Sequence, residues 1–576
     1  MKKQVVNREK IIMKTIYKSY MAVAVAALTL ATTSCIKEID PQTSYVTAEQ
    51  AANAPGAFES FVSSLTSSLN GQFTYGGSSN YPWDFGYPSF FLQRDVMGQD
   101  MAAESSGSEW YTTWYTCGTG LGPTYAICQL PWRYYFKWIK NCNNVISLAG
   151  PDPSADKKAG AGIAYAMRAM FYMDLARMYA PETYAKNKDA ETVPIVTETT
   201  SDPSNPRATN QAMWDFILSD LNKAESLLAD YKRDNVYTPD VSVVYGLKAR
   251  AYLTMEDWAN AESYAKKAQD GYTMMTKDEY LSKTDGFNKP NSSWMFGLTF
   301  RSTDPNITDN DADSSWGSQM IIEVSASQCG YSANYVGPKR IDAHLFSTIP
   351  ATDFRRMCWI DPAVDETIAD ADPATEAGQA TIKTALADYT DDPMGVYNTG
   401  YNVSARESVG CIPLKFRPKD GVHDNQYTAF TVAVPLMRVE EMMLIEAEAA
   451  GMQDESRGKT LLETFAKTRD DSYEYGHHQE AYYNNATSQF QNEVWWQRRV
   501  ELWGEGFATF DIKRLQKGII RSYEGTNHID GYQWNSETTP GWMNLCIVQS
   551  ETNNNPACTN NPTPVAPKGN SPKFGF

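Results

Sequence analysis

The segment VVYGLKARAYLTMEDWANAESYAKKAQDGY, residues 243 to 272, limits the possible fold more than any other part of this sequence. Small and aromatic residues recur in it at fixed offsets; they are Ala249, Tyr252, Trp258, Ala261, Tyr264, Ala265 and Ala268. Two antiparallel helices approach closely only where alanines face each other, with aromatic rings filling the gaps beside them. This spacing is typical of a tetratricopeptide repeat, with Glu256 in place of the usual turn glycine. The alternative is an ordinary amphipathic helical hairpin.

Apolar residues recur at helical spacing elsewhere in the chain as well. They predict helices at about 47–70, 126–148, 159–180, 210–229, 241–271, 435–450, 457–468 and 488–516. Polar segments rich in Gly, Pro and Asn predict long loops between them, at 73–125, 281–317, 361–410 and beyond 521. Two short β-branched runs, 320–326 and 427–435, predict small strands.

These patterns predict a mainly α fold, in which tetratricopeptide-like helical hairpins form a scaffold with long irregular loops and a few short β-strands. The scaffold helices are expected at about 159–271 and 435–470, with C-terminal helices and loops at about 488–576. Such repeats bury a core between neighbouring pairs and leave one face free for interactions. We expect residues 35–576 to form one domain.

The N-terminus has the layout of an export signal. Lys14 and Lys18 precede an apolar stretch of about 11 residues, which is shorter than the roughly 20 that span a bilayer. Small residues then lead directly to Cys35, followed by charged residues. We therefore predict a lipoprotein signal peptide at residues 1–34, with Cys35 acylated as the membrane anchor. A soluble secreted protein is the alternative, because Thr32 occupies a position that is usually aliphatic in such signals.

The charge and the cysteine pattern restrict the possible partners and cofactors. The chain carries 69 acidic and 51 basic residues, so we expect no nucleic-acid partner. Cys128 and Cys142 share one predicted helix about 21 Å apart, too far for a disulfide, and we expect the cysteines to be mostly free, buried thiols. No CxxC, HExxH or GxSxG pattern occurs, and we predict no metal, no cofactor and no catalytic residues.

One acidic run resembles the start of a calcium-binding loop. Asp309, Asp311 and Asp313 stand at alternate positions, but Ser314 and Met320 occupy the places where a calcium loop needs glycine and glutamate. We interpret this segment as a solvated loop.

Aromatic residues are concentrated between residues 73 and 138, where they make up 18 of 66 positions against 12% of the whole chain. A pyranose stacks its C–H face on an aromatic ring, and rigid, amphipathic Tyr and Trp suit this contact. The ligand-binding candidates are the aromatic residues among turn-forming or polar neighbours: Tyr81, Trp83, Trp110, Tyr111, Trp114, Trp294 and Trp316. Seven other rings of the region are expected in the core; they are Phe85, Phe90, Phe91, Trp132, Tyr135, Phe136 and Trp138.

The order of several segments resembles the SusD/RagB family of Bacteroidetes surface lipoproteins. The matching segments are AMRAMFYMDLARMYA with VPIVTE, PRATNQAMWDFILSDLNKAESLL, the helical pair of 243–272, IPLKFRP, VPLMRVEEMMLIEAEA and WWQRRVELWGEGFATFDIKR. The resemblance implies a SusD-like α-α superhelix at the cell surface that binds nutrients and sits over a SusC-like TonB-dependent transporter. Arg498, Arg499 and Glu501 match an arginine-rich helix of the family, which we interpret as scaffold, with Arg498 and Glu501 spaced to pair.

The leading hypothesis is therefore a non-enzymatic outer-membrane lipoprotein. It would bind oligosaccharides at the cell surface and deliver them to the transporter. One alternative within the family is peptide binding. Two alternatives from other classes are a glycoside hydrolase, which would use two carboxylates, and a protein scaffold without a small ligand.

Overall fold

The computed structural model describes residues 56–73, 81–103, 111–117, 121–324, 330, 337–397 and 408–576. The chain divides into two compact units, Met1–Ala57 and Phe58–Phe576. The expected signal peptide and Cys35 lie outside the described residues, so both stay predictions. Within the described ranges, no helix combines the length and the apolar character that crossing a membrane requires.

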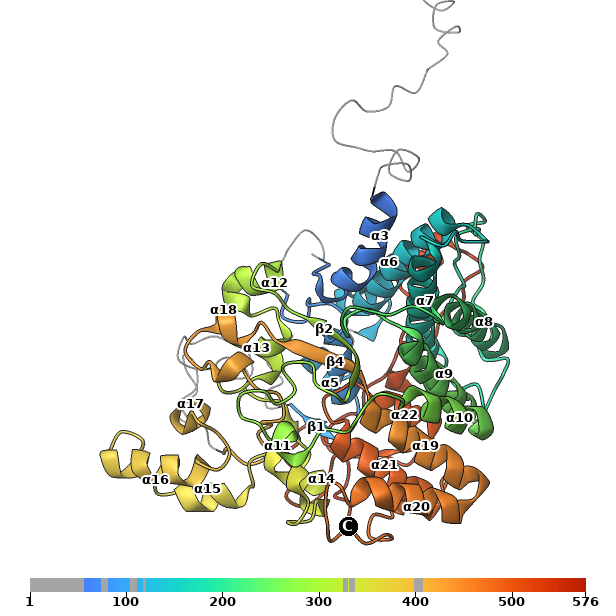
Figure 1. The fold of residues 1–576 in the computed structure, drawn as a ribbon. Helices are drawn as coiled ribbons and strands as arrows, with labels where there is room; N and C mark the ends of the chain where they lie inside the picture. The colour runs from blue at the N-terminus through green and yellow to red at the C-terminus, as the bar shows by residue number, and fades with distance from the viewer. Residues whose placement is uncertain are drawn as a thin grey trace, which may run out of the picture. The chain divides into compact units, whose positions relative to one another are not determined.

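Eight helices form the frame of the second unit. They are α6 (Ala126–Ala149), α7 (Lys158–Tyr179), α8 (Asn210–Leu228), α9 (Val241–Met255), α10 (Trp258–Ala268), α19 (Val439–Gln453), α20 (Glu455–Ala466) and α21 (Gln489–Glu501). From α6 to α10 each helix packs against the next, α10 packs against α19, and α19 packs against both α20 and α21 (Figure 1). The mainly α fold and its helical frame are confirmed.

The α9–α10 hairpin confirms the packing that the alanine spacing predicts. Its four facing alanines are fully buried; they are Ala249, Ala261, Ala265 and Ala268. The rings of Tyr252 and Tyr264 stack beside them, with centroids 5.6 Å apart. Glu256 ends α9 in the left-handed conformation, at φ 58°, where glycine is usual, and the Asp257 side chain caps α10 by accepting from Asn260 N.

Among the described residues, the strands are short and form three antiparallel pairs. These are β1 (Met101–Ala102) with β3 (Arg340–Ile341), β2 (Trp294–Thr299) with β4 (Ala433–Arg438), and β5 (Ile519–Ile520) with β6 (Asn535–Ser536). The β2–β4 pair joins the loop-rich middle of the chain to the start of α19, which follows β4 directly.

Two strand predictions need correction. The strand predicted at 320–326 is wrong for its described part, because Met320 ends helix α13 (Trp316–Met320) and residues 321–324 form no strand. The run 427–435 begins instead as helix α18 (Gln426–Ala429), because the Asn425 side chain accepts from Tyr427 N and starts a helical turn. Only its last part belongs to β4.

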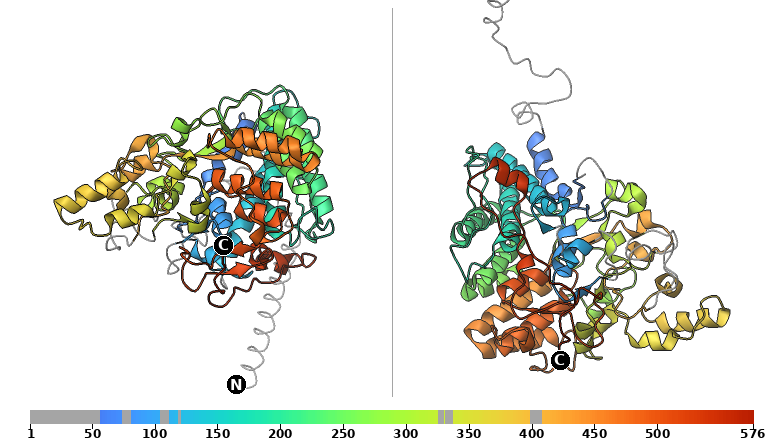
Figure 2. Two further views of the ribbon diagram at one scale, coloured as in Figure 1. Left: turned by 90° about the horizontal axis from the view of Figure 1, so that it is seen from below. Right: turned by 180° about the vertical axis from the view of Figure 1, so that it is seen from behind.

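Shorter helices complete the fold, and several of them lie inside the predicted loops. They include α3 (Ala57–Ser67), α4 (Ser89–Val96), α5 (Thr112–Tyr115), α11 (Lys277–Tyr280), α12 (Pro305–Thr308), α14 (Ala343–Thr348), α15 (Ala363–Ile368), α16 (Glu376–Leu386), α17 (Pro393–Tyr397), α22 (Ala508–Arg514) and α23 (Gln549–Asn554). Helices α15 to α17 pack on a small hydrophobic core of their own, which includes Ile360, Ile382 and Leu386, and Figure 2 shows them together.

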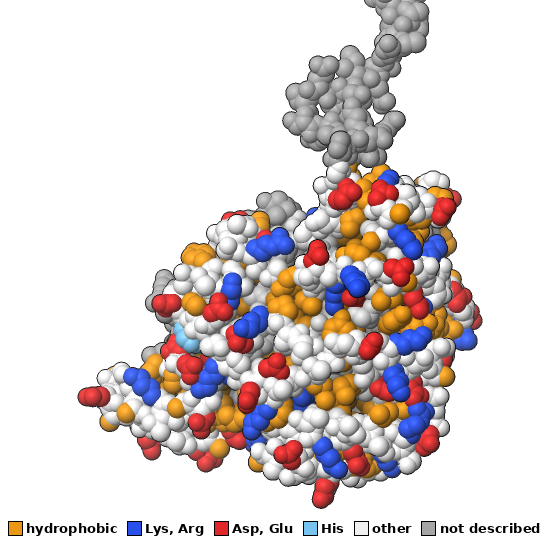
Figure 3. All heavy atoms as spheres, in the orientation of Figure 1, with side chains coloured by type: hydrophobic (Ala, Val, Ile, Leu, Met, Phe, Trp, Pro, Cys, Tyr) orange, Lys and Arg blue, Asp and Glu red, His pale blue; other side chains and the backbone are white. Residues whose placement is uncertain are grey.

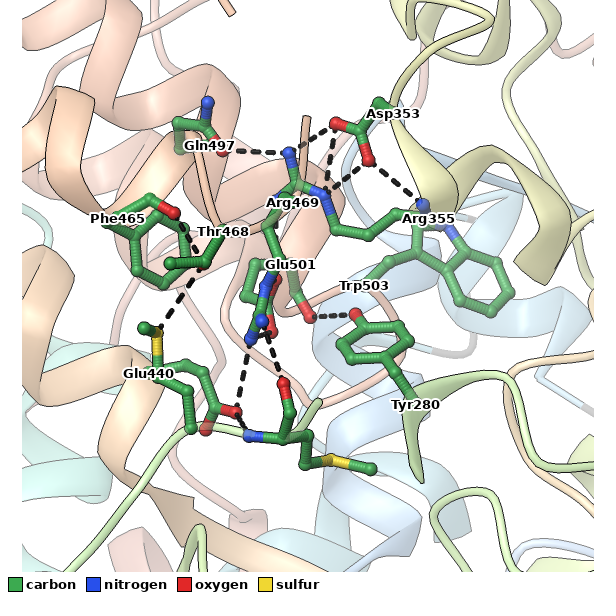
Figure 4. A network of polar contacts seen from close by, with 12 residues as sticks. Tyr280, Asp353, Arg355, Glu440, Phe465, Thr468, Arg469, Gln497, Glu501 and Trp503 are labelled. Carbon is green, nitrogen blue, oxygen red and sulfur yellow. Dashed lines mark hydrogen bonds and ion pairs between the residues drawn. The ribbon is translucent and has the colours of Figure 1, made fainter. Parts of the chain in front are cut away.

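Helix α21 carries charged side chains into the interior, and Figure 4 shows the polar contacts around one of them, Glu501. The Glu501 carboxylate pairs with Arg355 at 3.2 Å, Arg438 at 3.2 Å and Arg469 at 3.1 Å. Burial alone would raise the pKa of Glu501, but the three guanidinium groups hold it well below its usual range. These buried pairs support the interpretation of α21 as scaffold.

The pairing predicted between Arg498 and Glu501 does not form. Arg498 instead donates to Asp511 on α22 at 2.7 Å, while Arg499 pairs with Asp100 and Glu480. The spacing on the helix permits a pair, but Arg498 and Glu501 each bind partners from other segments instead.

The cysteines follow the prediction. Among the described residues all seven thiols are free and buried; they are Cys117, Cys128, Cys142, Cys358, Cys411, Cys546 and Cys558. Cys128 and Cys142 both lie on α6, and burial raises the pKa of the Cys117 thiol to about 12.

Candidate functional site

Four of the predicted ligand-binding aromatic residues meet in one cluster. The Tyr81 ring stacks on Trp83, with centroids 4.7 Å apart and planes 27° apart. Trp83 contacts the Trp114 ring edge-on at 6.4 Å, and Trp114 lies 5.2 Å from Tyr111. The turn that starts at Tyr81 supplies two of these rings, and α5 with the residue before it supplies the other two.

Most of this cluster is enclosed. Trp83 is 3% exposed, and Tyr111 and Trp114 are 1% exposed each, because the rings cover one another and Tyr111 also packs on Phe85. These three rings therefore lack the open face expected of a sugar-binding platform, and ligand contact by them stays a prediction. Tyr81 is only partly buried and keeps accessible surface. Trp110 lies outside the described residues.

The two tryptophans predicted in polar loops lie instead at the start of regular elements, and ligand contact by them stays a prediction. Trp294 is the first residue of β2 and is fully buried. Trp316 is the first residue of α13, which Ser315 caps, and its ring meets Phe416 edge-on at 5.1 Å. The polar neighbours of both residues start a regular element rather than an open loop, so the tryptophans point into the core.

A buried lysine lies beside the cluster, and no sequence pattern marks it. Lys339 donates from Nζ to Gln319 Oε1 at 2.6 Å and lies 5.2 Å from the Tyr111 ring centroid. Gln319 in turn donates to the backbone oxygen of Pro82, between Tyr81 and Trp83. Burial lowers the pKa of Lys339 to about 7, because an enclosed ammonium group loses its water shell. Its neighbours in GPKRID are typical of surface sequence.

Open hollows lie elsewhere on the unit. One of 970 Å³ is bordered by α7 and α8, one of 690 Å³ lies between α14 and residues 470–482, and one of 490 Å³ is bordered by Arg340 and Asp365. On the described part of the face in Figure 3, acidic and basic side chains are interspersed with apolar ones, without a broad basic patch. The 690 Å³ hollow is rich in Tyr and His, which the sequence analysis did not select as ligand-binding residues.

Two carboxyl groups have pKa values in the range of a general acid. Burial raises the pKa of Asp95 to about 7 and that of Asp313 to about 6. The Asp95 carboxylate accepts from Gly506 N and Ala508 N, and Asp313 accepts from Gly330 N. Both are thus bound to the backbone inside the protein, where they stabilise loops.

The acidic run at 309–313 is partly a solvated loop. Asp309 and Asp311 are exposed, and Asp311 accepts from the Tyr427 hydroxyl at 2.8 Å. Asp313 is buried, contrary to the prediction, because it holds the backbone of Gly330. Across the described residues, no three His, Cys, Asp or Glu side chains are grouped so that they could hold a metal ion.

Two family models match the sequence. The model described as "Starch-binding associating with outer membrane" matches residues 91–253, and the model described as "SusD family" matches residues 387–563. None of the curated proteins matches the chain.

Solved structures with the same fold cover most of the chain. A SusD-like carbohydrate binding protein from Bacteroides vulgatus is 22% identical, with a TM-score of 0.65 over 87% of this chain and 97% of its own. A SusD superfamily protein from Bacteroides thetaiotaomicron is 19% identical, with a TM-score of 0.62 over 90% and 100%. The surface glycan-binding protein A of Bacteroides thetaiotaomicron, solved with laminarihexaose, is 16% identical, with a TM-score of 0.58 over 86% and 97%.

The family models match both the frame helices α7 to α9 and the charged helices α21 and α22, and the fold matches along nearly the whole chain. The chain therefore belongs to the SusD/RagB family.

Proposed function

We propose that this protein binds oligosaccharides at the cell surface without cleaving them and passes them to a SusC-like TonB-dependent transporter. The observation that carries the proposal is the match to two SusD models, together with a shared fold with a surface glycan-binding protein solved with laminarihexaose. The carboxylates of Asp95 and Asp313 both accept from backbone amides inside the protein, so these two groups do not form the reachable pair that a glycosidase needs.

Tyr81 is the proposed contact residue of the primary site. Its side chain is half-buried and keeps some accessible surface, and a tyrosine ring is a flat, amphipathic partner for the C–H face of a sugar. Trp83 supports the ring from behind, and Trp114 supports Trp83, so Tyr81 loses little freedom when a ligand binds. In this proposal Trp83, Tyr111 and Trp114 hold the platform in place, Trp294 and Trp316 belong to the core, and Trp110 is a further contact candidate.

The membrane attachment is part of the same proposal. An acylated Cys35 would hold the protein on the outer membrane, where captured sugars are needed for transport. The model described as associating with the outer membrane supports this location. The helical frame from α7 to α10 supports a docking surface for the transporter, since repeat helices expose one face.

Affinity purification from outer membranes tests the attachment and the partner together. We expect the tagged native protein to fractionate with the outer membrane and to co-purify with a TonB-dependent barrel. The Cys35→Ala protein should leave the membrane fraction, because no acyl chain can form. A protein that stays soluble with Cys35 intact, or that purifies without any barrel, would contradict the anchoring and delivery steps.

A further inference from the structure

The hollow of 690 Å³ lies between α14 and the segment that follows α20. Its size is within the roughly 300–1,000 Å³ of ligand pockets. Five ring side chains line it: His344, Tyr473, His477, His478 and Tyr482. It shares no lining residue with the Tyr81 cluster.

Tyr482 is held as a fixed platform at this hollow. Its side chain is 37% exposed, yet its hydroxyl donates to Glu480 Oε2 at 3.0 Å and lies 3.2 Å from His344 Nε2. Glu480 is itself fixed by Arg499 Nη1 at 2.6 Å. An aromatic ring that is already oriented binds a ligand at a low entropic cost.

The imidazole rings are also held in place by stacking. His478 lies on Trp496, with centroids 3.4 Å apart and planes 6° apart. His344 lies on Phe576 in the same way, at 3.3 Å and 5°. Burial lowers the pKa of His478 to about 3 and that of His344 to about 4, so both rings are neutral at physiological pH.

The charges of the hollow select against anionic ligands. Its lining includes no Lys or Arg, while Asp470, Glu474 and Glu480 contribute carboxylates. Hydroxyl and amide groups from Thr352, Ser472 and Gln479 complete the lining. Rings with hydrogen-bonding groups around them suit a neutral molecule with many hydroxyls, because its C–H face can stack while its hydroxyls donate to carboxylates.

The hollow continues into a second one, so an elongated ligand fits better than a single ring. The neighbouring hollow, of 380 Å³, shares Thr352, Asp470 and Ser472 with the first. Lys277, Arg469 and Asp471 also line this neighbouring hollow, and the Arg469 charge is engaged by Glu440 and Glu501.

We propose that this hollow is a second carbohydrate-binding site, specific for a neutral oligosaccharide, with the Tyr482 ring as its stacking platform. The inference rests on the proposed glycan-binding function and adds a site to it. Two sites on one anchored protein would hold a polysaccharide at two points and raise its effective concentration.

Hydrogen–deuterium exchange on the purified protein tests the site. The neutral probes are laminarihexaose, cellohexaose, maltohexaose, xylohexaose and mannohexaose, and the acidic counter-probe is hexagalacturonate. With at least one neutral probe we expect slower exchange in residues 470–484, both in the native protein and in Tyr81→Ala, whose primary platform is removed. Hexagalacturonate should leave this segment unchanged.

Calorimetry in the Tyr81→Ala background measures the contribution of Tyr482. Adding Tyr482→Ala should weaken the remaining binding by about tenfold or more, because the stacking surface is lost. Tyr482→Phe keeps the ring and should weaken it by less than about threefold. Tyr125→Ala is the matched control, since Tyr125 is 48% exposed and lines none of these hollows.

The outcomes separate the second site from the proposed function. If neutral sugars bind the native protein but exchange in 470–484 never changes, the second site is wrong and the proposed function stands. If no probe binds the native protein at all, both are wrong. The exchange measurement on the native protein tests whether the second site binds sugar, even if Tyr482→Ala does not fold.

Discussion

The phenol ring of Tyr81 stacks on the indole of Trp83, with the two centroids 4.7 Å apart. Tyr81 keeps accessible surface, while Trp83 is only 3% exposed. Two aromatic residues that look alike in sequence therefore differ in exposure, and our proposal assigns ligand contact to Tyr81 and support to Trp83. The same distinction applies to Trp316, which lies between Phe91 and Phe416.

Replacing Trp316 by alanine should mainly reduce stability. The ring is 1% exposed, so Trp316→Ala leaves a cavity and should lower the free energy of unfolding by about 3–5 kcal/mol. Urea denaturation measures this loss, and exposed Tyr125→Ala, as the control, should change stability by less than about 1 kcal/mol. Equal small effects of both substitutions would show that Trp316 does not pack in the core.

Glycine at position 256 should stabilise the α9–α10 hairpin. Glu256 has a φ of 58°, a left-handed conformation that costs a non-glycine residue roughly 1 kcal/mol. We expect Glu256→Gly to raise the melting temperature slightly, and Glu256→Ala, which keeps the strain, to leave it unchanged or lower it. Calorimetric melting of the two variants separates backbone strain from loss of the side chain. A lower melting temperature for Glu256→Gly than for Glu256→Ala would contradict this account.

The stability of the protein should depend on pH through Lys339. The folded pKa is about 7, whereas an unfolded lysine has a pKa of about 10.4. Between these values the unfolded chain binds more protons, so the free energy of unfolding rises with pH. From pH 7 to 9, the free energy of unfolding of the native protein should rise by roughly 2 kcal/mol relative to that of Lys339→Met.

Urea denaturation at the two pH values measures this gain. Lys266 is exposed, so Lys266→Met is the control, and its free energy of unfolding should change between the two pH values as that of the native protein does. If the free energies of unfolding of the native protein and Lys339→Met differ by the same amount at pH 7 and pH 9, the Lys339 amine is not buried as described.

The Glu501 carboxylate should contribute strongly to the stability of the folded protein. Glu501→Gln leaves the guanidinium groups of Arg355, Arg438 and Arg469 without their shared charge, and should cost about 3–5 kcal/mol. Because the folded pKa lies below the unfolded value of about 4.3, the contribution of this carboxylate is present above that pH and is lost as the pH falls below it.

Denaturation at pH 7 and pH 3 follows the loss of this contribution. The difference in free energy of unfolding between the native protein and Glu501→Gln should be smaller at pH 3 than at pH 7. Exposed Glu474→Gln is the control and should show little difference at either pH. A Glu501→Gln protein as stable as the native one at pH 7 would contradict the network.

The frame could be predicted from the sequence because helix periodicity is local. The alanine spacing of α9 and α10, and the apolar pattern of α6 and α7, depend only on residues within one or two turns. The β2–β4 pair could not be predicted in this way, because it joins Trp294 to Arg438 and each strand is only a few residues long. Strand pairing of that kind depends on tertiary contacts.

The candidate site was predicted less well for the same reason. A polar neighbour can place an aromatic ring in an open loop or can cap a buried element, as Ser315 does before Trp316, and composition does not distinguish the two. Lys339 beside Tyr111 and Tyr482 beside His344 come together only through contacts between segments distant in sequence. The sequence does not distinguish Tyr81 from the six other ligand-binding candidates, and its accessible surface becomes evident only in the folded structure.

The central claim is that the protein captures a glycan through Tyr81 and releases it intact. Titration calorimetry with the neutral hexasaccharides, followed by chromatography of the recovered sugar, tests both parts in one experiment. We predict saturable binding of at least one sugar, full recovery of the uncleaved hexasaccharide, and affinity at least about tenfold weaker in Tyr81→Ala with its melting temperature unchanged. Absence of binding to every sugar, cleaved product, or unaltered affinity in Tyr81→Ala would contradict the claim.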